Sequence, residues 1–318
     1  MLKTNRNSQL TLRRKQNEEG SKKNTTEITT LSNAEVNFFS HQGYLILPSF
    51  LSTEHCARLT RDIDQLLEQR TSGYASRNSD ANGTARIISF PDLGALTSHP
   101  PMIAKIRALM STDGFAFHHQ HANRHGEGTV ASNWHHDYEQ FPQTDREQLM
   151  VHCFYYPTGL NGEIGDLLIL PRSHQSVMHR NAFSDKFYTE DLPGSITLDN
   201  LPSGSVVIVH SALLHARRAK PGGTKNPRYF TDVSYCQVGP QKWPAYGFPL
   251  PKMWLHQQVC DRALSAGHGR NTEFDFIYNT SIFYDPDTAT EEQRAGMERM
   301  LIQQQVDPRV REKIKPSA

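Results

Sequence analysis

The sequence predicts a mainly β protein, a sandwich or barrel with helices on its flanks. From Phe115 to about Tyr235, short apolar or alternating runs such as LMVHCFYY and SVVIV are separated by Gly, Pro and Asn clusters. Helical spacing of apolar residues occurs near the two ends of the chain, before residue 111 and around residues 289–304. Short strands with turn signals between them are typical of an antiparallel sandwich or barrel.

The composition is that of a folded protein without a membrane span. The 318 residues are 36% hydrophobic, and 34 Lys+Arg nearly balance 33 Asp+Glu. This balance excludes wholesale disorder and disfavours nucleic-acid binding, which needs a basic excess. No apolar run approaches the roughly 20 residues that cross a bilayer, and the four cysteines form no CxxC pair. We therefore expect a cytoplasmic protein without disulfides, whose oligomeric state the sequence does not reveal.

The chain divides into three segments by composition. Residues 1–33 are polar and lack a hydrophobic period, which predicts a disordered basic tail, although the same composition also suits an organelle transit peptide. Residues 34–288 are expected to form one β-rich domain, and residues 289–318 a C-terminal helix and tail.

The first ordered elements carry clear terminal signals. Ser32 opens a capping box ahead of a short helix that Gly43 ends, and residues 44–47 then form a short strand. Ser52 is the expected N-cap of a second helix, in which these apolar residues repeat at helical spacing: Cys56, Leu59, Ile63, Leu66 and Leu67. A third helix is expected over residues 101–110.

The first candidate functional residues lie in Trp134-His135-His136-Asp137. In a strand, residues i and i+2 point to the same face, so His135 and Asp137 share a side while His136 points away. One imidazole and one carboxylate on one side supply two ligands for a divalent metal. The pair alone is weak evidence, because a surface strand with polar residues has the same pattern.

A second element completes a possible ligand set. Residues 205–209 predict a buried strand, a short connection leads to His215, and Arg228 opens the next strand. His135, Asp137 and His215 make a two-histidine, one-carboxylate set, the arrangement of mononuclear non-haem Fe(II) oxygenases. Such a set leaves coordination positions for a 2-oxo acid and for dioxygen.

Arg228 suits the far end of such a 2-oxo acid. A planar guanidinium binds a carboxylate bidentately, so Arg228, brought beside His215 by a returning strand, is expected to anchor the C5 carboxylate of 2-oxoglutarate. The alternatives are ordinary: Arg228 is a solvated charge at a strand end, and His215 is a core histidine bonded to a backbone carbonyl.

At these residues the chain resembles the phytanoyl-CoA dioxygenase (PhyH) family of Fe(II)/2-oxoglutarate-dependent oxygenases. EVNFFSHQGYLILPSFLSTEHCARLTRDID is similar to that family's opening helix, strand and second helix, and WHHDYE to its WHxD strand. NGEIGDLLILPRSHQ and SGSVVIVHSALLHARRA, with the Pro-Arg pair at 227–228, are similar to its later motifs. The resemblance covers residues 33–236 in pieces. It implies a double-stranded β-helix, or jelly-roll, core of the cupin-like type with flanking helices.

Residue by residue, the resemblance implies that His135, Asp137 and His215 bind Fe(II) and that Arg228 binds 2-oxoglutarate. Gln120 is similar to a family position that hydrogen-bonds 2-oxoglutarate, with an ordinary strand amide as the alternative.

Two positions depart from the family pattern. Arg217 stands where a small hydroxyl residue often helps to hold the C5 carboxylate, so Thr231 would have to assist instead. Arg172 stands where the family usually has Gly, so we expect the backbone there to avoid positive φ.

These features predict a dioxygenase that uses Fe(II), 2-oxoglutarate and O2 to hydroxylate, desaturate or oxidatively cyclise a small molecule, with release of succinate and CO2. Halogenating relatives carry Gly or Ala in place of the carboxylate ligand, so Asp137 argues against halogenation. Two rivals stay open, a jelly-roll zinc hydrolase or isomerase and a PhyH-like binding protein without turnover. Arg217 and Arg218 either pair an anionic substrate group near the mouth of the site or belong to a solvated loop.

Histidine is unusually dense in one stretch, because seven of the 16 histidines lie between His118 and His152. A second metal site among His118, His119, His121 and His125 fits no ligand spacing that is typical of metals. Strand histidines with local hydrogen bonds are the simpler expectation.

Overall fold

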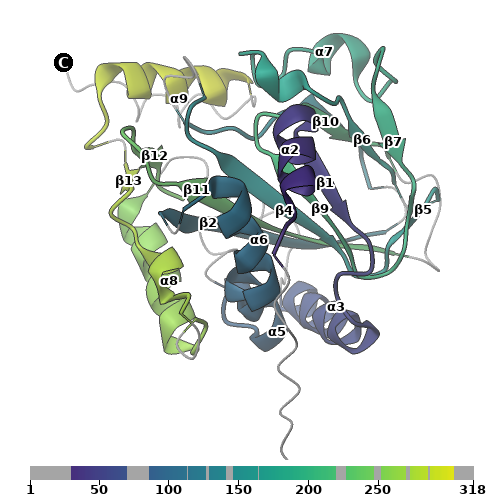
Figure 1. The fold of residues 1–318 in the computed structure, drawn as a ribbon, viewed down its shortest axis with the longest axis horizontal. Helices are drawn as coiled ribbons and strands as arrows, with labels where there is room; N and C mark the ends of the chain where they lie inside the picture. The colour runs from purple at the N-terminus through teal and green to yellow at the C-terminus, as the bar shows by residue number, and fades with distance from the viewer. Residues whose placement is uncertain are drawn as a thin grey trace, which may run out of the picture.

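The structure is a computed structural model in which two β-sheets form a sandwich with helices on its flanks (Figure 1). It describes residues 30–69, 86–112, 114–126, 129–140, 146–163, 165–219, 227–246, 252–269, 273–285 and 287–303. Residues 1–29 of the predicted basic tail and residues 304–318 of the predicted C-terminal tail lie outside this description, so the division into three segments stays a prediction.

The N-terminal elements begin and end where the sequence predicts. They are α2 (Asn33–Gln42), β1 (Tyr44–Leu47) and α3 (Thr53–Glu68). The hydroxyl of Ser32 accepts from the N–H of Glu35 at 3.3 Å, and the Glu35 carboxylate accepts from the N–H of Ser32 at 2.7 Å. Gly43 ends α2 with φ 84°, a conformation that glycine adopts without strain, and Ser52 caps α3 through its side chain.

Two antiparallel sheets face each other, and their strand orders do not follow the chain. The larger sheet has the order β1-β9-β4-β11-β2, with β9 (Ser205–His210), β4 (Met150–Tyr156), β11 (Arg228–Gln237) and β2 (Phe115–His125) beside β1. The smaller sheet has the order β3 (Ser132–His135), β10 (His215–Arg217), β6 (Leu167–Ile169) and β7 (Ile196–Leu198). Two short pairs complete the strands, β5 (Leu160–Asn161) with β8 (Asn200–Leu201) and β12 (Trp243–Pro244) with β13 (Phe283–Tyr284). This is the predicted jelly-roll.

The remaining helices are α5 (Pro91–Ala95), α6 (Pro100–Met110), α7 (Ser184–Phe187), α8 (Met253–Ser265) and α9 (Glu291–Gln303), with short 3-10 turns η1 (Leu96–Ser98), η2 (Ser173–Gln175) and η3 (Asp275–Tyr278). The sequence predicts α6 and α9. It misses α7 and α8, which lie between the two regions of expected helix. Two residues of α8 depart from the usual pattern, because Trp254 is 64% exposed while His256 is fully buried beside Leu255, Val259, Cys260 and Ala263.

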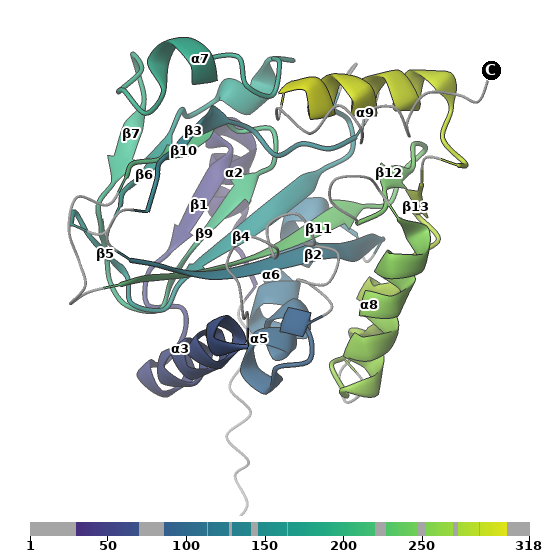
Figure 2. The ribbon, with the colours of Figure 1, turned by 180° about the vertical axis from the view of Figure 1, so that it is seen from behind.

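The two faces of the larger sheet bury different side chains. Cys153 and Tyr155 of β4 pack with residues of α3, α5 and α6, on what we call the helix face. Phe154 and Tyr156 pack with residues of β6 in the smaller sheet, on what we call the inner face. Figures 1 and 2 show α3, α5, α6 and α8 on one side of the larger sheet and α7 on the other.

A β-bulge in β2 decides which of its side chains face inward. β11 pairs Val233 with Gln120 and Tyr235 with Phe117, so two residues of β2 together oppose Ser234. The extra residue shifts the alternation of β2 by one. Beyond the bulge, Gln120 therefore lies on the helix face.

The backbone at Arg172 contradicts the sequence expectation, because it adopts φ 68°. Its N–H donates to the carbonyl of Gln42 at 3.0 Å, and η2 starts directly after it. The left-handed conformation costs a non-glycine residue about 1–2 kcal/mol. The hydrogen bond from Arg172 to Gln42, at the end of α2, offsets that cost.

In the part of the chain that the structure describes, every helix is too short or too polar to cross a membrane. The four cysteines are free and buried: Cys56, Cys153, Cys236 and Cys260.

Candidate metal centre

Strand pairing brings the two predicted metal-binding histidines together. β10 runs antiparallel to β3 with His215 directly opposite His135, and the centroids of their rings are 4.4 Å apart. Asp137 follows the end of β3, where its N–H donates to the carbonyl of Ser211 at 2.7 Å. His136 points away, as predicted, with Nε2 3.1 Å from a backbone carbonyl.

Both imidazoles are held in the same way. Nδ1 of His135 lies 2.6 Å from the carbonyl of Asn133, and Nδ1 of His215 lies 3.0 Å from the carbonyl of Leu213. An imidazole that donates from Nδ1 keeps its lone pair on Nε2. Each Nε2 faces Asp137, at 3.7 Å from Oδ1 for His135 and 3.3 Å from Oδ2 for His215.

His135, Asp137 and His215, which we call the metal-binding cluster after the site they are expected to form, carry donor atoms that suit a ferrous ion. The ligand atoms of this cluster all lie within 4.8 Å of one another. Two imidazole nitrogens and one carboxylate oxygen are the donor set of non-haem Fe(II) sites, and Nδ1–carbonyl bonds are the outer contacts that orient such ligands. Burial, aided by the neighbouring His215, lowers the pKa of His135 to about 4, so the ring is neutral and its Nε2 is free to bind a cation.

Arg180 holds the carboxylate of Asp137. Its Nη2 donates to Oδ1 at 2.7 Å, and the two side chains are only 14% and 17% exposed. Burial raises the pKa of Asp137, but His135, His215 and Arg180 outweigh this effect and hold the pKa well below its ordinary value. Arg180 carries no sequence signal, since it lies in a loop between η2 and α7 without a recognisable pattern.

Arg228 is a buried cation with unused donors. It begins β11 and is 2% exposed. Its Nη2 donates to the hydroxyl of Tyr156 at 3.1 Å, and its guanidinium carbon lies 5.1 Å from the ring centroid of Tyr156 and 5.4 Å from that of Phe230. Nε and Nη1 are buried without a hydrogen-bond partner in the described part of the chain. Because burying an unpaired charged donor is costly, Arg228 is suited to an anionic ligand.

Aromatic contacts join Arg228 to the metal-binding cluster along the inner face. The ring of Phe154 lies 5.4 Å from that of His215 and 5.5 Å from that of Phe230, centroid to centroid. Phe230 in turn flanks the guanidinium of Arg228. A series of ring contacts on the inner face therefore connects Arg228 with the metal-binding residues.

The two other residues expected to contact 2-oxoglutarate lie on the opposite face. The side-chain amide of Gln120 donates to the carbonyl of Leu93 at 2.7 Å. Thr231 is opposite Tyr155 in the β11–β4 register, shares its helix face and donates its hydroxyl to a carbonyl of β2 at 2.7 Å. The structure thus corrects both expectations, because neither side chain is on the face of Arg228.

The arginines near the end of β10 are engaged within the protein. Arg218 pairs with Asp166 at 3.2 Å and with Asp191 at 2.6 Å. Arg217 donates to the carbonyl of Val130 at 2.8 Å. For Arg218 these pairs favour the solvated-loop interpretation over a substrate contact.

Comparison with known families agrees with this geometry. A family model described as phytanoyl-CoA dioxygenase (PhyH) matches residues 39–224, more than half of the chain. The chain belongs to the phytanoyl-CoA dioxygenase family. Membership confirms the predicted enzyme class, an Fe(II)- and 2-oxoglutarate-dependent oxygenase, and its predicted cofactors. The match includes all three residues of the metal-binding cluster and ends shortly before Arg228.

Individual relatives are distant. The chain is 23% identical over 230 residues to a probable alpha-ketoglutarate-dependent hypophosphite dioxygenase of Stutzerimonas stutzeri, covering 65% of this chain and 78% of that protein. Its fold is similar to that of the non-haem alpha-ketoglutarate-dependent carbocyclase SnoK from nogalamycin biosynthesis (TM-score 0.53, 17% identity, covering 69% and 89% of the two chains). EctD from S. alaskensis, solved with 2-oxoglutarate and 5-hydroxyectoine, is similar to the same extent (TM-score 0.53, 17% identity, 71% and 83%).

Proposed function

We propose that this oxygenase holds Fe(II) with His135, Asp137 and His215, binds the C5 carboxylate of 2-oxoglutarate with Arg228, and oxidises a small molecule. The products from the cosubstrate are succinate and CO2. The change in the substrate is a hydroxylation, a desaturation or an oxidative ring closure.

The pairing of His215 with His135 is the observation that supports this assignment most strongly. Neighbouring strands present both rings to one point, and the Nδ1–carbonyl bonds leave both Nε2 atoms for a cation. The ordinary alternative is that His215 is a core histidine whose only task is its hydrogen bond to a carbonyl. That alternative does not explain why His135 and the carboxylate of Asp137 both lie beside Nε2 of His215.

Each residue then has a distinct task. Bound at this cluster, Fe(II) would supply the centre at which dioxygen is reduced at the expense of 2-oxoglutarate. Arg180 keeps Oδ1 of Asp137 occupied, so that Oδ2, the oxygen nearer His215, is presented to the cation. Phe154 and Phe230 supply an apolar lining along the stretch between the cluster and Arg228.

The substrate class is proposed more broadly. The relatives include a probable hypophosphite dioxygenase, a carbocyclase and an enzyme solved with 5-hydroxyectoine, all of which concern small molecules. We propose a small-molecule substrate and no nucleic-acid partner. A cytoplasmic location is consistent with four free cysteines.

The test starts with anaerobic protein, Fe(II) and 2-oxoglutarate. We expect the weak visible charge-transfer band of the chelate, and slow succinate release once air is admitted. A zinc hydrolase or isomerase would show no need for 2-oxoglutarate, and a binding protein without turnover would give the band but no succinate. Either result would overturn the proposal.

A further inference from the structure

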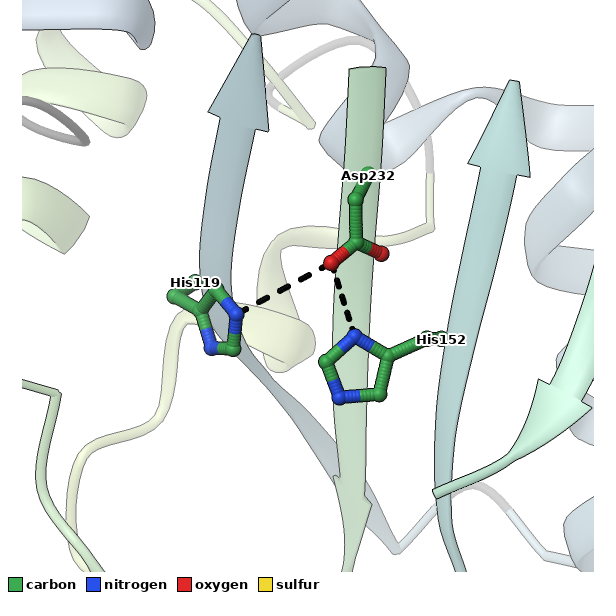
Figure 3. Close-up of side chains that lie close together, drawn as sticks. All are labelled: His119, His152 and Asp232. Atoms are coloured by element: carbon green, nitrogen blue, oxygen red, sulfur yellow. Dashed lines mark hydrogen bonds and ion pairs between the residues drawn. The ribbon is translucent and has the colours of Figure 1, made fainter. Parts of the chain in front are cut away.

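A second group of histidine and aspartate side chains lies on the inner face, outside the metal-binding cluster. We call it the inner-face cluster: His119 on β2, His152 on β4 and Asp232 on β11, all buried (Figure 3). Oδ2 of Asp232 lies 2.8 Å from Nδ1 of His152 and 3.9 Å from Nε2 of His119. The bulge in β2 is what turns His119 toward this face, and His152 reaches it as the partner of Ser234 in β11.

The bonding within this cluster leaves two buried polar atoms unsatisfied. Nδ1 of His152 donates to Asp232, and Nδ1 of His119 lies 3.0 Å from the hydroxyl of Ser234. Nε2 of His152 and Oδ1 of Asp232 are buried, and neither has a hydrogen-bond partner among the described residues. A buried polar atom without a partner is costly, so a ligand that pairs with Nε2 of His152 would recover that free energy.

The charge state of His152 makes Nε2 a donor. Burial lowers the pKa of His152, but the carboxylate of Asp232, together with the more distant Asp137 and Glu139, outweighs burial and raises the pKa to about 9. At neutral pH the ring is therefore an imidazolium. Its Nδ1–H is used by Asp232, and its Nε2–H remains for an acceptor.

The strand register separates His152 from the cosubstrate arginine. Phe154, which contacts the ring of His215, is opposite Asp232 in β11. From Asp232, β11 continues in one direction to Arg228 and in the other to Ser234, which is opposite His152. Arg228 and His152 thus lie on opposite sides of the point that faces the metal-binding cluster.

We infer that His152, held by Asp232, binds an anionic oxygen of the substrate, a carboxylate or another oxyanion, through Nε2–H. This inference rests on the proposed function, because 2-oxoglutarate bound to Arg228 occupies the other side and leaves the His152 side to the substrate. Nδ1–H of His152 stays with Asp232, so the pair acts as one fixed donor.

The test uses full-length protein loaded with Ni(II), which blocks turnover, and with 2-oxoglutarate. The probes are acetate, its neutral isostere acetamide, and hypophosphite, each titrated calorimetrically. We expect both anions to bind more tightly than acetamide. His152→Gln, which retains a polar side chain without the charge, should weaken both anions about 10- to 100-fold and leave acetamide and 2-oxoglutarate unchanged. Ser234→Ala is the matched control, since the hydroxyl of Ser234 is hydrogen-bonded to His119 and not to Nε2 of His152, and this variant should bind the anions like the unsubstituted protein.

A second measurement needs no variant. Nitrogen-15 NMR of the unsubstituted protein should find the His152 ring doubly protonated at neutral pH, with a Nε2–H signal that shifts on adding acetate and not on adding acetamide.

Two binding results would overturn the inference: equal anion affinity in the unsubstituted protein and in His152→Gln, or no anion binding at all. A third result would also overturn it, namely two metal equivalents per chain that fall to one in His152→Gln, because the inner-face cluster would then be a metal site. If the unsubstituted protein bound neither Ni(II) nor 2-oxoglutarate, the failure would be a different one, because the proposed function would fall and the inference with it.

Discussion

The metal-binding cluster and the inner-face cluster have the same composition, two histidines and one aspartate, but their nitrogens are used differently. In the metal-binding cluster both Nδ1 atoms bond backbone carbonyls, and both Nε2 atoms face Asp137. In the inner-face cluster the aspartate itself takes Nδ1 of His152 at 2.8 Å. In the metal-binding cluster the nitrogen lone pairs face one carboxylate, whereas in the inner-face cluster a proton already lies between Nδ1 of His152 and Oδ2 of Asp232.

This difference shows that proximity of histidine and aspartate does not define a metal site. A cation needs deprotonated nitrogens with their other ring atom held by an outer partner. In the metal-binding cluster burial keeps His135 neutral, and backbone carbonyls hold Nδ1 of both rings. In the inner-face cluster the nitrogen of His152 that faces Asp232, Nδ1, is already hydrogen-bonded to it, Nε2 has no partner among the described residues, and the ring is protonated. The clusters are therefore expected to respond in opposite ways to matched substitutions.

The largest effect is expected from Asp137→Asn set against Asp232→Asn. Asparagine is a poor ligand, so Asp137→Asn should lower Co(II) affinity by at least about 100-fold, since disturbing an outer contact alone costs 10- to 100-fold, and should abolish succinate formation. Asp232→Asn should still hold one Co(II) per chain. Metal content after anaerobic loading and dialysis measures both, and an equal loss of metal in the two variants would remove the distinction between the clusters.

The next largest effect is expected on the binding of 2-oxoglutarate by Arg228. Arg228→Lys keeps the charge but loses the planar fork, so the dissociation constant of 2-oxoglutarate should rise about 10- to 100-fold with the metal content unchanged. Arg218→Lys is the control, because Arg218 pairs with Asp166 and Asp191 and should leave 2-oxoglutarate binding as it was. Titration of the charge-transfer band measures both constants. Unchanged affinity in Arg228→Lys would assign the C5 carboxylate to another residue.

The predicted site residues differ in whether the structure places their side chains on the inner face, and the difference has a simple origin in strand geometry. His135 ends β3 and Asp137 follows two residues later, and their side chains share one side, as the alternation rule predicts. Thr231 is three residues from Arg228 in the same strand, and an odd spacing puts the two side chains on opposite faces. That error was avoidable from the sequence alone.

The expectation that Gln120 contacts 2-oxoglutarate is wrong for a reason that cannot be read from the sequence. Phe115 and Phe117 lie on the helix face, and unbroken alternation would have turned Gln120 inward. The bulge opposite Ser234 inserts one residue and brings His119 inward instead. Nothing in the local residue types marks this bulge. The inner-face cluster could not be predicted for the same reason, since it also needs the register of three strands.

The fold itself followed more closely from local signals. The capping residues Ser32 and Ser52 predict their helices well, because a side-chain oxygen that satisfies a free N–H acts within one turn of chain. Helix α8 lacks such a signal, and its N-cap Lys252 makes no side-chain capping hydrogen bond. Its packing is decided by tertiary contacts, which bury His256 and expose Trp254.

The smallest expected effect is on stability, and it separates the protonated ring of His152 from the neutral ring of His135. The pKa of His152 rises on folding from 6.5 to about 9, so between these values the folded state binds the proton more tightly than the unfolded state. The stabilisation is fully present below about pH 6.5 and disappears as the pH rises through about 9, with a total of at most about 3 kcal/mol.

His152→Gln removes this titration, so the difference in free energy of unfolding between the protein and the variant should shrink as the pH rises. Urea denaturation from about pH 6 to about pH 10 measures it. His135 has its pKa lowered on folding, to about 4, so a protonated His135 would instead make acid destabilising. A difference for His152→Gln that stays constant or grows with pH would mean that His152 is neutral in the fold, and the two clusters would then differ in which nitrogen bonds but not in charge.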